Sequence, residues 1–298
     1  MRVGLCFPGQ GSQAAGMAAG LETTDLGRRL LSAAAGLGAD LSAVFGDGEE
    51  SLRPTDVAQP ALVFTELVLA GALPRKTEVV AVAGHSVGEL SACAAAGALE
   101  PETALRLSIE RGRLMAAMHE GVMAAVLGLD AGTVEEICGA VDGIVVVANL
   151  NGPGQVVISG TRPAVAAASA RAQQAGARRV VPLRVGGAFH SPLMEQAGAA
   201  FAQLLDATPI RDATVPVVAN VDAAPVRDAG DIRERLRLQL VSPVHWTESV
   251  QRMVELGADT LIEVGPGSVL TGLARRIVPG VRALSVSTLA AASGLAVG

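Results

Sequence analysis

The chain has 298 residues, 50% of them hydrophobic, and a formal net charge of −6 at pH 7. This length and hydrophobic content are enough to bury a large core, which excludes a disordered chain. Lys76 is the only lysine, the other basic residues are arginines, and no long basic run occurs, so the composition argues against a nucleic-acid-binding protein.

The cysteines and the apolar runs bear on the cellular compartment. Cys6, Cys93 and Cys138 lie far apart, without the paired spacing of metal ligands, and we expect them to be reduced core residues of a cytoplasmic protein. The longest apolar run, residues 61–73, is too short to span a bilayer, and residues 1–6 are too few for the core of a signal peptide. The sequence therefore predicts a soluble protein without a membrane partner.

Strand-like and helical segments alternate from the start of the chain. A strand is expected at residues 2–7, followed by a glycine-rich loop at 8–13, and a second buried strand is expected at 78–83. An alanine-rich helix follows at 90–96, and the clearest helix spans 101–120. This alternation predicts an α/β fold with a largely parallel sheet.

A different order of elements begins after Gly121. It reads strand, helix, strand, strand, helix, strand, at residues 122–128, 133–139, 144–150, 155–159, 163–176 and 178–185. This is the order of a ferredoxin-like unit, whose first and last strands are neighbours, so that its ends lie close together as an insertion needs. We therefore predict a ferredoxin-like subdomain at 122–185, inserted into a large α/β domain formed by 1–121 and 186–298.

The remaining chain resumes the strand and helix units of the large domain. Helices are expected at 193–205, 233–241 and 269–276, and strands at 215–219 and 260–264. Residues 290–298 are small and lack periodicity, so we expect a frayed end.

Ser86 lies in a pattern typical of a nucleophile elbow. Glycines stand two residues to either side of it, at 84 and 88, between an apolar strand and a helix. Such a turn exposes the hydroxyl above a helix N-terminus, where backbone amides favour an oxyanion. The pattern predicts covalent catalysis, and the alternative that stays open is a Gly-Ser turn that only joins strand to helix.

A serine nucleophile needs a base, and histidine is the best candidate. The side chain of His85, inside the elbow, should diverge from that of Ser86, and His119 is expected at a helix end, stabilised by the helix dipole. His190 lies on a glycine-bearing loop where the chain returns to the large domain, which favours a position in a cleft, although a structural role stays open. No acidic residue between Ser86 and His190 stands out, so we expect a Ser-His dyad oriented by a backbone carbonyl.

Arg111 lies off the apolar stripe of the helix expected at 101–120. It shares its side of the helix with Met115 and Ser108, where it would border a cleft. The alternative is a solvated arginine on the surface.

Several further blocks stand in a fixed order along the chain. Together with the elbow they occupy residues 7–13, 59–61, 84–89, 111–113, 151–157, 187–192, 243–246 and 263–267. In these blocks the chain resembles the malonyl-CoA:acyl carrier protein transacylase family, the discrete acyltransferases of fatty-acid and polyketide synthesis, over nearly its full length. The resemblance implies a hydrolase-like α/β domain with an inserted ferredoxin-like subdomain, in agreement with the pattern of elements.

The resemblance also implies roles for individual residues. Ser86 matches the acylated nucleophile and His190 its general base. Gln10 and Val87 match the positions whose backbone amides form the oxyanion hole, and Arg111 matches the arginine that binds the free carboxylate of the malonyl group. An acyl group without a carboxylate would leave this charge buried and unpaired, at a cost of about 3 to 5 kcal/mol, so we expect neutral acyl groups to be excluded.

Phe189, His245 and Met115 complete the residues expected at the substrate. The bulk of Phe189 resembles the malonyl-preferring variant of the family, because it would crowd an α-methyl branch. The resemblance places the carbonyl that orients His190 in the segment 244–246, where His245 departs from the usual glutamine or arginine.

The implied reaction is a ping-pong transfer without a metal or redox cofactor: malonyl-CoA acylates Ser86, and the thiol of acyl carrier protein then removes the malonyl group. The acidic carrier is expected to dock on local positive charge of a monomer. Candidate docking residues are Arg178, Arg179, Arg275 and Arg276. A polyketide-line acyltransferase, a substituted malonyl substrate, an acyl-thioester hydrolase and a non-catalytic scaffold stay open as alternatives.

Overall fold

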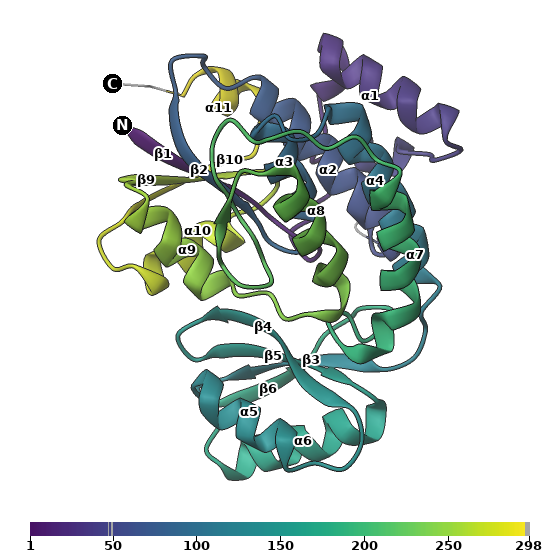
Figure 1. Ribbon diagram of the computed structural model, residues 1–298, viewed down its shortest axis with the longest axis vertical. Helices are drawn as coiled ribbons and strands as arrows, with labels where there is room; N and C mark the ends of the chain where they lie inside the picture. The colour runs from purple at the N-terminus through teal and green to yellow at the C-terminus, as the bar shows by residue number, and fades with distance from the viewer. Residues whose placement is uncertain (47, 49, 296–298) are drawn as a thin grey trace.

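Two separate β-sheets, each with its own helices, make up the computed structural model, which describes residues 1–46, 48 and 50–295 (Figure 1). The larger sheet has the strand order β10-β9-β1-β2-β7-β8. Its neighbours pair in parallel except for β7 and β8. The strands are β1 (Arg2–Phe7), β2 (Glu78–Gly84), β7 (Val217–Val218), β8 (Pro225–Val226), β9 (Thr260–Val264) and β10 (Arg282–Val286). The predicted α/β class with a largely parallel sheet is confirmed.

A hydrophobic core covers each face of this sheet, and side chains along β1 point alternately into the two cores. Leu5 and Phe7 join one hydrophobic core, whereas Cys6 between them joins the core on the opposite face. The first core holds side chains of α1 (Asp25–Gly36), α2 (Thr55–Gly71), α3 (Gly88–Ala95), α4 (Pro101–Ala116), α7 (Glu195–Asp206), α8 (Ala229–Leu238) and α11 (Leu289–Ser293). The second holds side chains of α9 (Trp246–Glu255) and α10 (Val269–Ile277).

The helix α2 lies at the centre of the first core. Apart from Asp56 and Val57 near its start, every residue of α2 as far as Leu69 is buried, which explains why most of its side chains are apolar. No helix in the described part of the chain combines the length and the apolar character needed to cross a membrane.

The smaller sheet is antiparallel and has the order β4-β5-β3-β6. Its strands are β3 (Val122–Leu127), β4 (Val145–Gly152), β5 (Gln155–Gly160) and β6 (Arg179–Pro182), and its helices are α5 (Ala131–Gly139) and α6 (Arg162–Gln174). Both helices pack on one face of this sheet, at the opposite end of the molecule from α1 (Figure 1). The predicted order of elements is present, and pairing of β3 with β6 brings the entry and the exit of the segment together. The boundaries 122 and 185 of an inserted unit stay a prediction.

The site is positioned by the ends of two parallel strands. Phe7 at the end of β1 is paired with Gly84 at the end of β2, so the glycine-rich loop and the elbow leave the sheet side by side. Carboxyl ends of parallel strands are where open α/β sheets bind their ligands.

Several elements differ from the sequence prediction. The frayed end expected at 290–298 is wrong for its first residues: α11 forms there because Thr288 caps Ala291 N with its hydroxyl and Ala292 is buried, whereas 296–298 lie outside the described residues. The helices α1, α2 and α9 and the strands β8 and β10 were not predicted, and α4 ends at Ala116 rather than at residue 120. Short 3-10 turns occur at Leu21–Thr23, Ser42–Phe45, Glu50–Leu52, Pro192–Met194 and Gln239–Val241.

Gly88 offers a test of the contact between the two strand ends. A Cβ at this position would lie 2.3 Å from the carbonyl oxygen of Phe7 and 2.7 Å from that of Pro8, and backbone atoms cannot move aside cheaply. We expect Gly88→Ala to lower the free energy of unfolding by about 1 to 3 kcal/mol or more, measured by urea denaturation.

The matched control is Gly272→Ala, within α10, where an added Cβ meets nothing within 4 Å. This change should leave stability equal or raise it by about 1 kcal/mol, because alanine is the better helix former. Equal unfolding midpoints for the two variants would show that the close approach at Gly88 is not rigid.

Candidate active site

Ser86 occupies the turn between β2 and α3 with a backbone φ of 53°, a left-handed conformation that is strained for a residue with a Cβ. The fully buried side chain of Asn220 holds this turn from both ends. Its Oδ1 accepts a hydrogen bond from Ser86 N at 2.7 Å, and its Nδ2 donates to Gly84 O at 2.6 Å. Asn220 was not identified from the sequence, although its position just after a predicted strand is a signal for a polar residue at the sheet edge.

The hydroxyl of Ser86 is in hydrogen-bond contact with His190. Ser86 Oγ lies 2.8 Å from His190 Nε2, and His190 also has a positive φ, 56°. Its Nδ1 lies 3.0 Å from Gln239 O and 3.1 Å from Ser242 O. Two carbonyl oxygens at Nδ1 require the proton there, which leaves Nε2 as an acceptor for the hydroxyl proton.

A backbone carbonyl therefore orients the imidazole, but its predicted place in segment 244–246 is wrong. Val244 O already accepts a hydrogen bond from Leu150 N, and His245 O accepts from the backbone of Ser249 in α9. The first of these bonds links the segment to β4, and the second begins α9. The acceptors for His190 Nδ1 therefore come from the preceding segment, from Gln239 O and Ser242 O.

Burial sets the protonation state of His190. Desolvation, followed by the positive charge of Arg111, lowers the pKa of His190 to about 3. The imidazole is therefore neutral over the physiological pH range and free to accept a proton.

Arg111 is buried against the same hydroxyl, with an exposed fraction of 1%, so the alternative of a solvated surface arginine is wrong. Its Nη2 donates to Ser86 Oγ at 3.1 Å and to Gln239 Oε1 at 2.9 Å, and its Nη1 donates to Gln59 Oε1 at 2.8 Å. Burial lowers the pKa of Arg111 to about 10, against the opposing effect of Glu89, so the guanidinium stays charged at neutral pH.

These groups open into two small cavities. One, of about 80 Å³, is lined by Ser86, His190 and most of the other residues expected at the site: Gln10, Val87, Met115 and Phe189. The second, of about 250 Å³, continues past His85 between the loop 8–12 and α10. In the described residues, no protein group accepts a hydrogen bond from the backbone N–H of Gln10 or of Val87.

His245 is not brought together with the others. It lines neither cavity, and its Nδ1 lies 3.8 Å from Glu248 Oε2, one turn further along α9. The nearby carboxylate of Glu248 raises the pKa of His245.

The other two histidines have no place at the nucleophile. The side chain of His85 diverges from that of Ser86 as expected: its Nε2 lies 2.8 Å from Asn151 Oδ1, and its ring lies against Trp246. His119 is exposed and lies beyond the end of α4, so its expected position at a helix end is wrong.

The cysteines are buried and free, as expected of core residues. Burial raises the pKa of the thiols of Cys6, Cys93 and Cys138, so they stay protonated. Among the residues that the structure describes, no cluster of histidine, cysteine and acidic side chains suits a metal ion.

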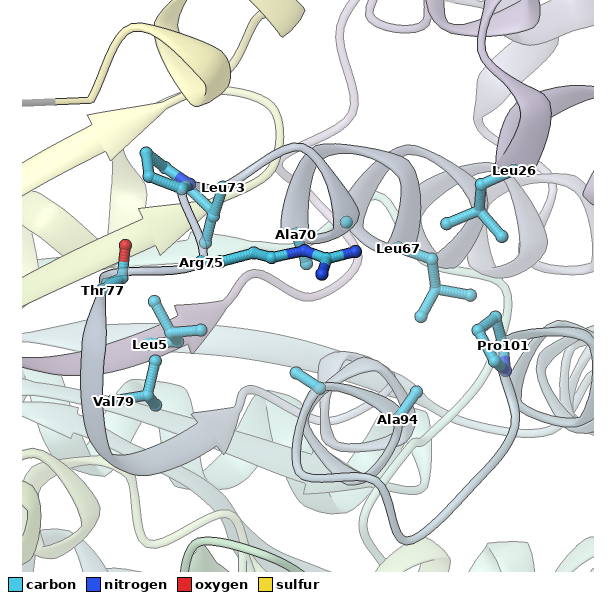
Figure 2. Close-up of a pocket in the computed structure, with 13 residues that line it drawn as sticks. Leu5, Leu26, Leu67, Ala70, Leu73, Arg75, Thr77, Val79, Ala94 and Pro101 are labelled. Carbon is cyan, nitrogen blue, oxygen red and sulfur yellow. The ribbon is translucent and has the colours of Figure 1, made fainter.

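A larger hollow, of about 310 Å³, lies away from this site (Figure 2). Apolar side chains line most of it, including Leu5, Leu67 and Val79, and Arg75 extends across it as the one charged residue of its lining. It contains neither a nucleophile paired with a base nor any group of the dyad, so the smaller cavities at Ser86 are the candidate active site.

A serine and a histidine in hydrogen-bond contact at the carboxyl edge of a parallel sheet suit an acyltransferase, and comparison with known proteins shows that class. Residues 5–292 match the acyl transferase domain family, and the chain belongs to this family. Curated relatives named malonyl CoA-acyl carrier protein transacylase include one from Bacillus subtilis, 41% identical over 96% of this chain and 93% of the relative, and one from Synechocystis, 41% identical over 97% and 98%. The family resemblance predicted from the sequence blocks is confirmed.

Solved structures give the same result. The crystal structure of the Synechocystis malonyl-CoA:ACP transacylase has a TM-score of 0.91 at 39% identity, covering 99% of this chain and 100% of that chain. A malonyl-transacylase solved in complex with the acyl-carrier protein of a type II polyketide synthase has a TM-score of 0.91 at 37% identity, covering 99% of both chains.

The protonation state of His190 can be measured directly. We expect its imidazole resonances to stay those of the neutral ring from pH 8 down to about pH 5 in histidine-labelled protein, because its pKa is lowered to about 3. A midpoint for His190 above about pH 6 would contradict the effect of burial and of Arg111.

Proposed function

We propose that this acyltransferase transfers a malonyl group from malonyl-CoA to the phosphopantetheine thiol of an acyl carrier protein, through a malonyl ester on Ser86. The observation that carries the proposal is the buried guanidinium of Arg111, 3.1 Å from the nucleophilic hydroxyl. The names of the relatives support the same substrates. Acylation follows the chemistry of an activated serine.

In the first half-reaction, His190 Nε2 takes the proton of Ser86 Oγ as the oxygen attacks the thioester carbonyl. The carbonyl oxygen becomes negative and accepts hydrogen bonds from Gln10 N and Val87 N, neither of which has another acceptor in the described residues. Removing one such donor typically costs about two to three powers of ten in rate. Collapse of the intermediate breaks the carbon–sulfur bond, and the imidazolium returns the proton to the leaving thiol of CoA.

The second half-reaction reverses these steps with a new thiol. His190 deprotonates the phosphopantetheine thiol of the carrier, the sulfur attacks the ester carbonyl, and Ser86 leaves with the proton. The two carbonyls at Nδ1 stabilise the imidazolium in both directions, which is the task that a carboxylate performs in a triad.

Arg111 accounts for the choice of acyl group. Its present partners are neutral oxygens, which leaves its charge without a carboxylate at hydrogen-bond distance among the described residues. A malonyl carboxylate supplies that direct partner, whereas an acetyl group supplies none. Removing one partner of a buried ion pair costs about 3 to 5 kcal/mol, equivalent to about two to three powers of ten. Phe189 and Met115 line the same cavity and restrict the space around the malonyl methylene.

We propose that the pantetheine arm occupies the second cavity, of about 250 Å³, between the loop 8–12 and α10. Arg276 Nη2 donates to Gln155 Oε1 at 2.7 Å, and Gln155 lines this cavity, so Arg276 stands at its rim. Arg275, Arg178 and Arg179 are also exposed. We assign the docking of an acidic carrier to this side of the protein. We further propose that the enzyme is a cytoplasmic monomer, and that its segment 122–185 is an inserted subdomain that forms one wall of the site.

Intact mass spectrometry with a panel of acyl-CoAs tests the proposal. We expect malonyl-CoA to give one covalent adduct that Ser86→Ala abolishes. Arg111→Ala should lower malonyl loading by about two to three powers of ten and improve acetyl loading relative to it, because the unpaired charge is gone.

The matched control is Arg113→Ala, on the same helix. Arg113 is exposed and pairs with Glu110 at 2.8 Å, so its removal should leave loading unchanged. An Arg111→Ala enzyme that still prefers malonyl to acetyl would refute the role of Arg111, and steady release of malonate without carrier would instead support a thioester hydrolase.

A further inference from the structure

The charge of Arg111 is connected to one carboxylate through a single side chain. Gln239 is 2% exposed, and its Oε1 accepts a hydrogen bond from Arg111 Nη2 at 2.9 Å. Its Nε2 donates to Ser86 O at 2.9 Å and to Glu89 Oε2. The amide of Gln239 thus separates a guanidinium from a carboxylate, both of them buried.

The direction of this amide matches the charges on either side. Its oxygen faces the cation and its nitrogen faces the anion, so its dipole favours an ionised Glu89 together with a protonated Arg111. Glu89 is also 2% exposed, and its second oxygen, Oε1, accepts from Asn220 N at 3.2 Å. Both oxygens of Glu89 therefore accept hydrogen bonds from N–H donors, which suits an ionised carboxylate because it has no proton to donate.

We propose that Glu89 is the counter-ion of Arg111 in the empty enzyme, and that it takes up a proton when an acyl group bearing a carboxylate binds to Arg111. The inference rests on the proposed function, because it needs a carboxylate-bearing substrate at Arg111. The proton comes from solvent, and no bond other than that to the proton is made or broken at Glu89.

The physical reason is competition for one positive charge. Two buried carboxylates beside one guanidinium leave a net negative charge in a medium that solvates it poorly, and protonation of one of them removes that charge. The substrate carboxylate contacts Arg111 directly, whereas Glu89 reaches it only through Gln239. Glu89 is therefore the group that becomes neutral.

Glu89 is poised for this change near neutral pH. Burial raises the pKa of Glu89 to about 7, against hydrogen bonds from Gln239 and Asn220 and the charge of Arg111, and with a smaller raising effect of Asp222. Cys93 lies on the same helix, and its thiol stays protonated. Elsewhere in the core His190 is neutral, and Glu66 on α2 is hydrogen-bonded to Ser91. When the substrate carboxylate pairs with Arg111, the guanidinium stabilises the ionised form of Glu89 less, and the pKa of Glu89 rises further.

Calorimetry in buffers of different ionisation enthalpy counts the protons. Malonyl-CoA is titrated into the Ser86→Ala protein, which binds but cannot be acylated. An upward pKa shift of about one to three units corresponds to uptake of about 0.4 to 0.9 proton per site at pH 8 and less than about 0.1 at pH 6, where Glu89 is already protonated. Acetyl-CoA, which carries the same CoA but no free carboxylate, should give no uptake at either pH.

Two variants in the same background assign the proton. Glu89→Gln should bind malonyl-CoA without uptake, and the matched control Glu66→Gln, which removes another buried carboxyl that is not linked to Arg111, should keep the uptake.

Binding of malonyl-CoA to the Ser86→Ala protein without uptake at pH 8, or equal uptake in Glu89→Gln, would overturn the inference. The inference can be tested even if the Glu89→Gln variant does not fold. The pH dependence and the acetyl-CoA comparison both use Ser86→Ala protein that retains Glu89. If malonyl-CoA forms no adduct with Ser86 in the parent enzyme, the proposed function itself fails, which is a separate result.

Discussion

The structure depends on a buried positive charge that no carboxylate contacts directly among the described residues. The guanidinium of Arg111 is held by two glutamine side chains, Gln59 and Gln239, and by the hydroxyl of Ser86. Neutral oxygens make a weaker partner for a guanidinium than a carboxylate does. The proposed malonyl transfer uses this charge to bind the incoming carboxylate. Burial and, to a smaller extent, the same charge lower the pKa of His190 and keep its imidazole neutral.

The parallel sheet provides the rigidity that this arrangement needs. The left-handed backbone at Ser86 and at His190 is unfavourable in a free chain and persists only where neighbours fix it. Asn220, in the turn after β7, holds the backbone at Ser86, and the turn at Gln239–Val241 presents a carbonyl that holds the ring of His190. Strain, orientation and charge are thus supplied by elements far apart in the sequence.

The sequence alone was sufficient for the α/β class and for the order of elements in 122–185, which have local signatures. The elbow at Ser86 also has one, whereas most of the residues now found around it were identified through the family resemblance of the sequence blocks. The sequence was not sufficient for Asn220 or Gln239. Their roles arise only when β7 and the turn after α8 pack against the elbow, and no local periodicity records such a contact. The orienting carbonyl was misplaced for the same reason. Every residue has a main-chain carbonyl, so the sequence does not distinguish one from another, and only the fold shows that Val244 O already accepts a hydrogen bond from Leu150 N.

Gln239 serves the enzyme with two different parts of one residue. Its carbonyl orients the imidazole, while its amide group touches the arginine, the acid and the backbone of the nucleophile. Replacing Arg111 to admit uncharged acyl groups would leave the buried amide oxygens of Gln59 and Gln239 without their donor. A change that widens the range of accepted acyl groups therefore has to alter positions 59, 111 and 239 together. At position 239 the new side chain must also keep the main-chain carbonyl in place, because that carbonyl orients His190.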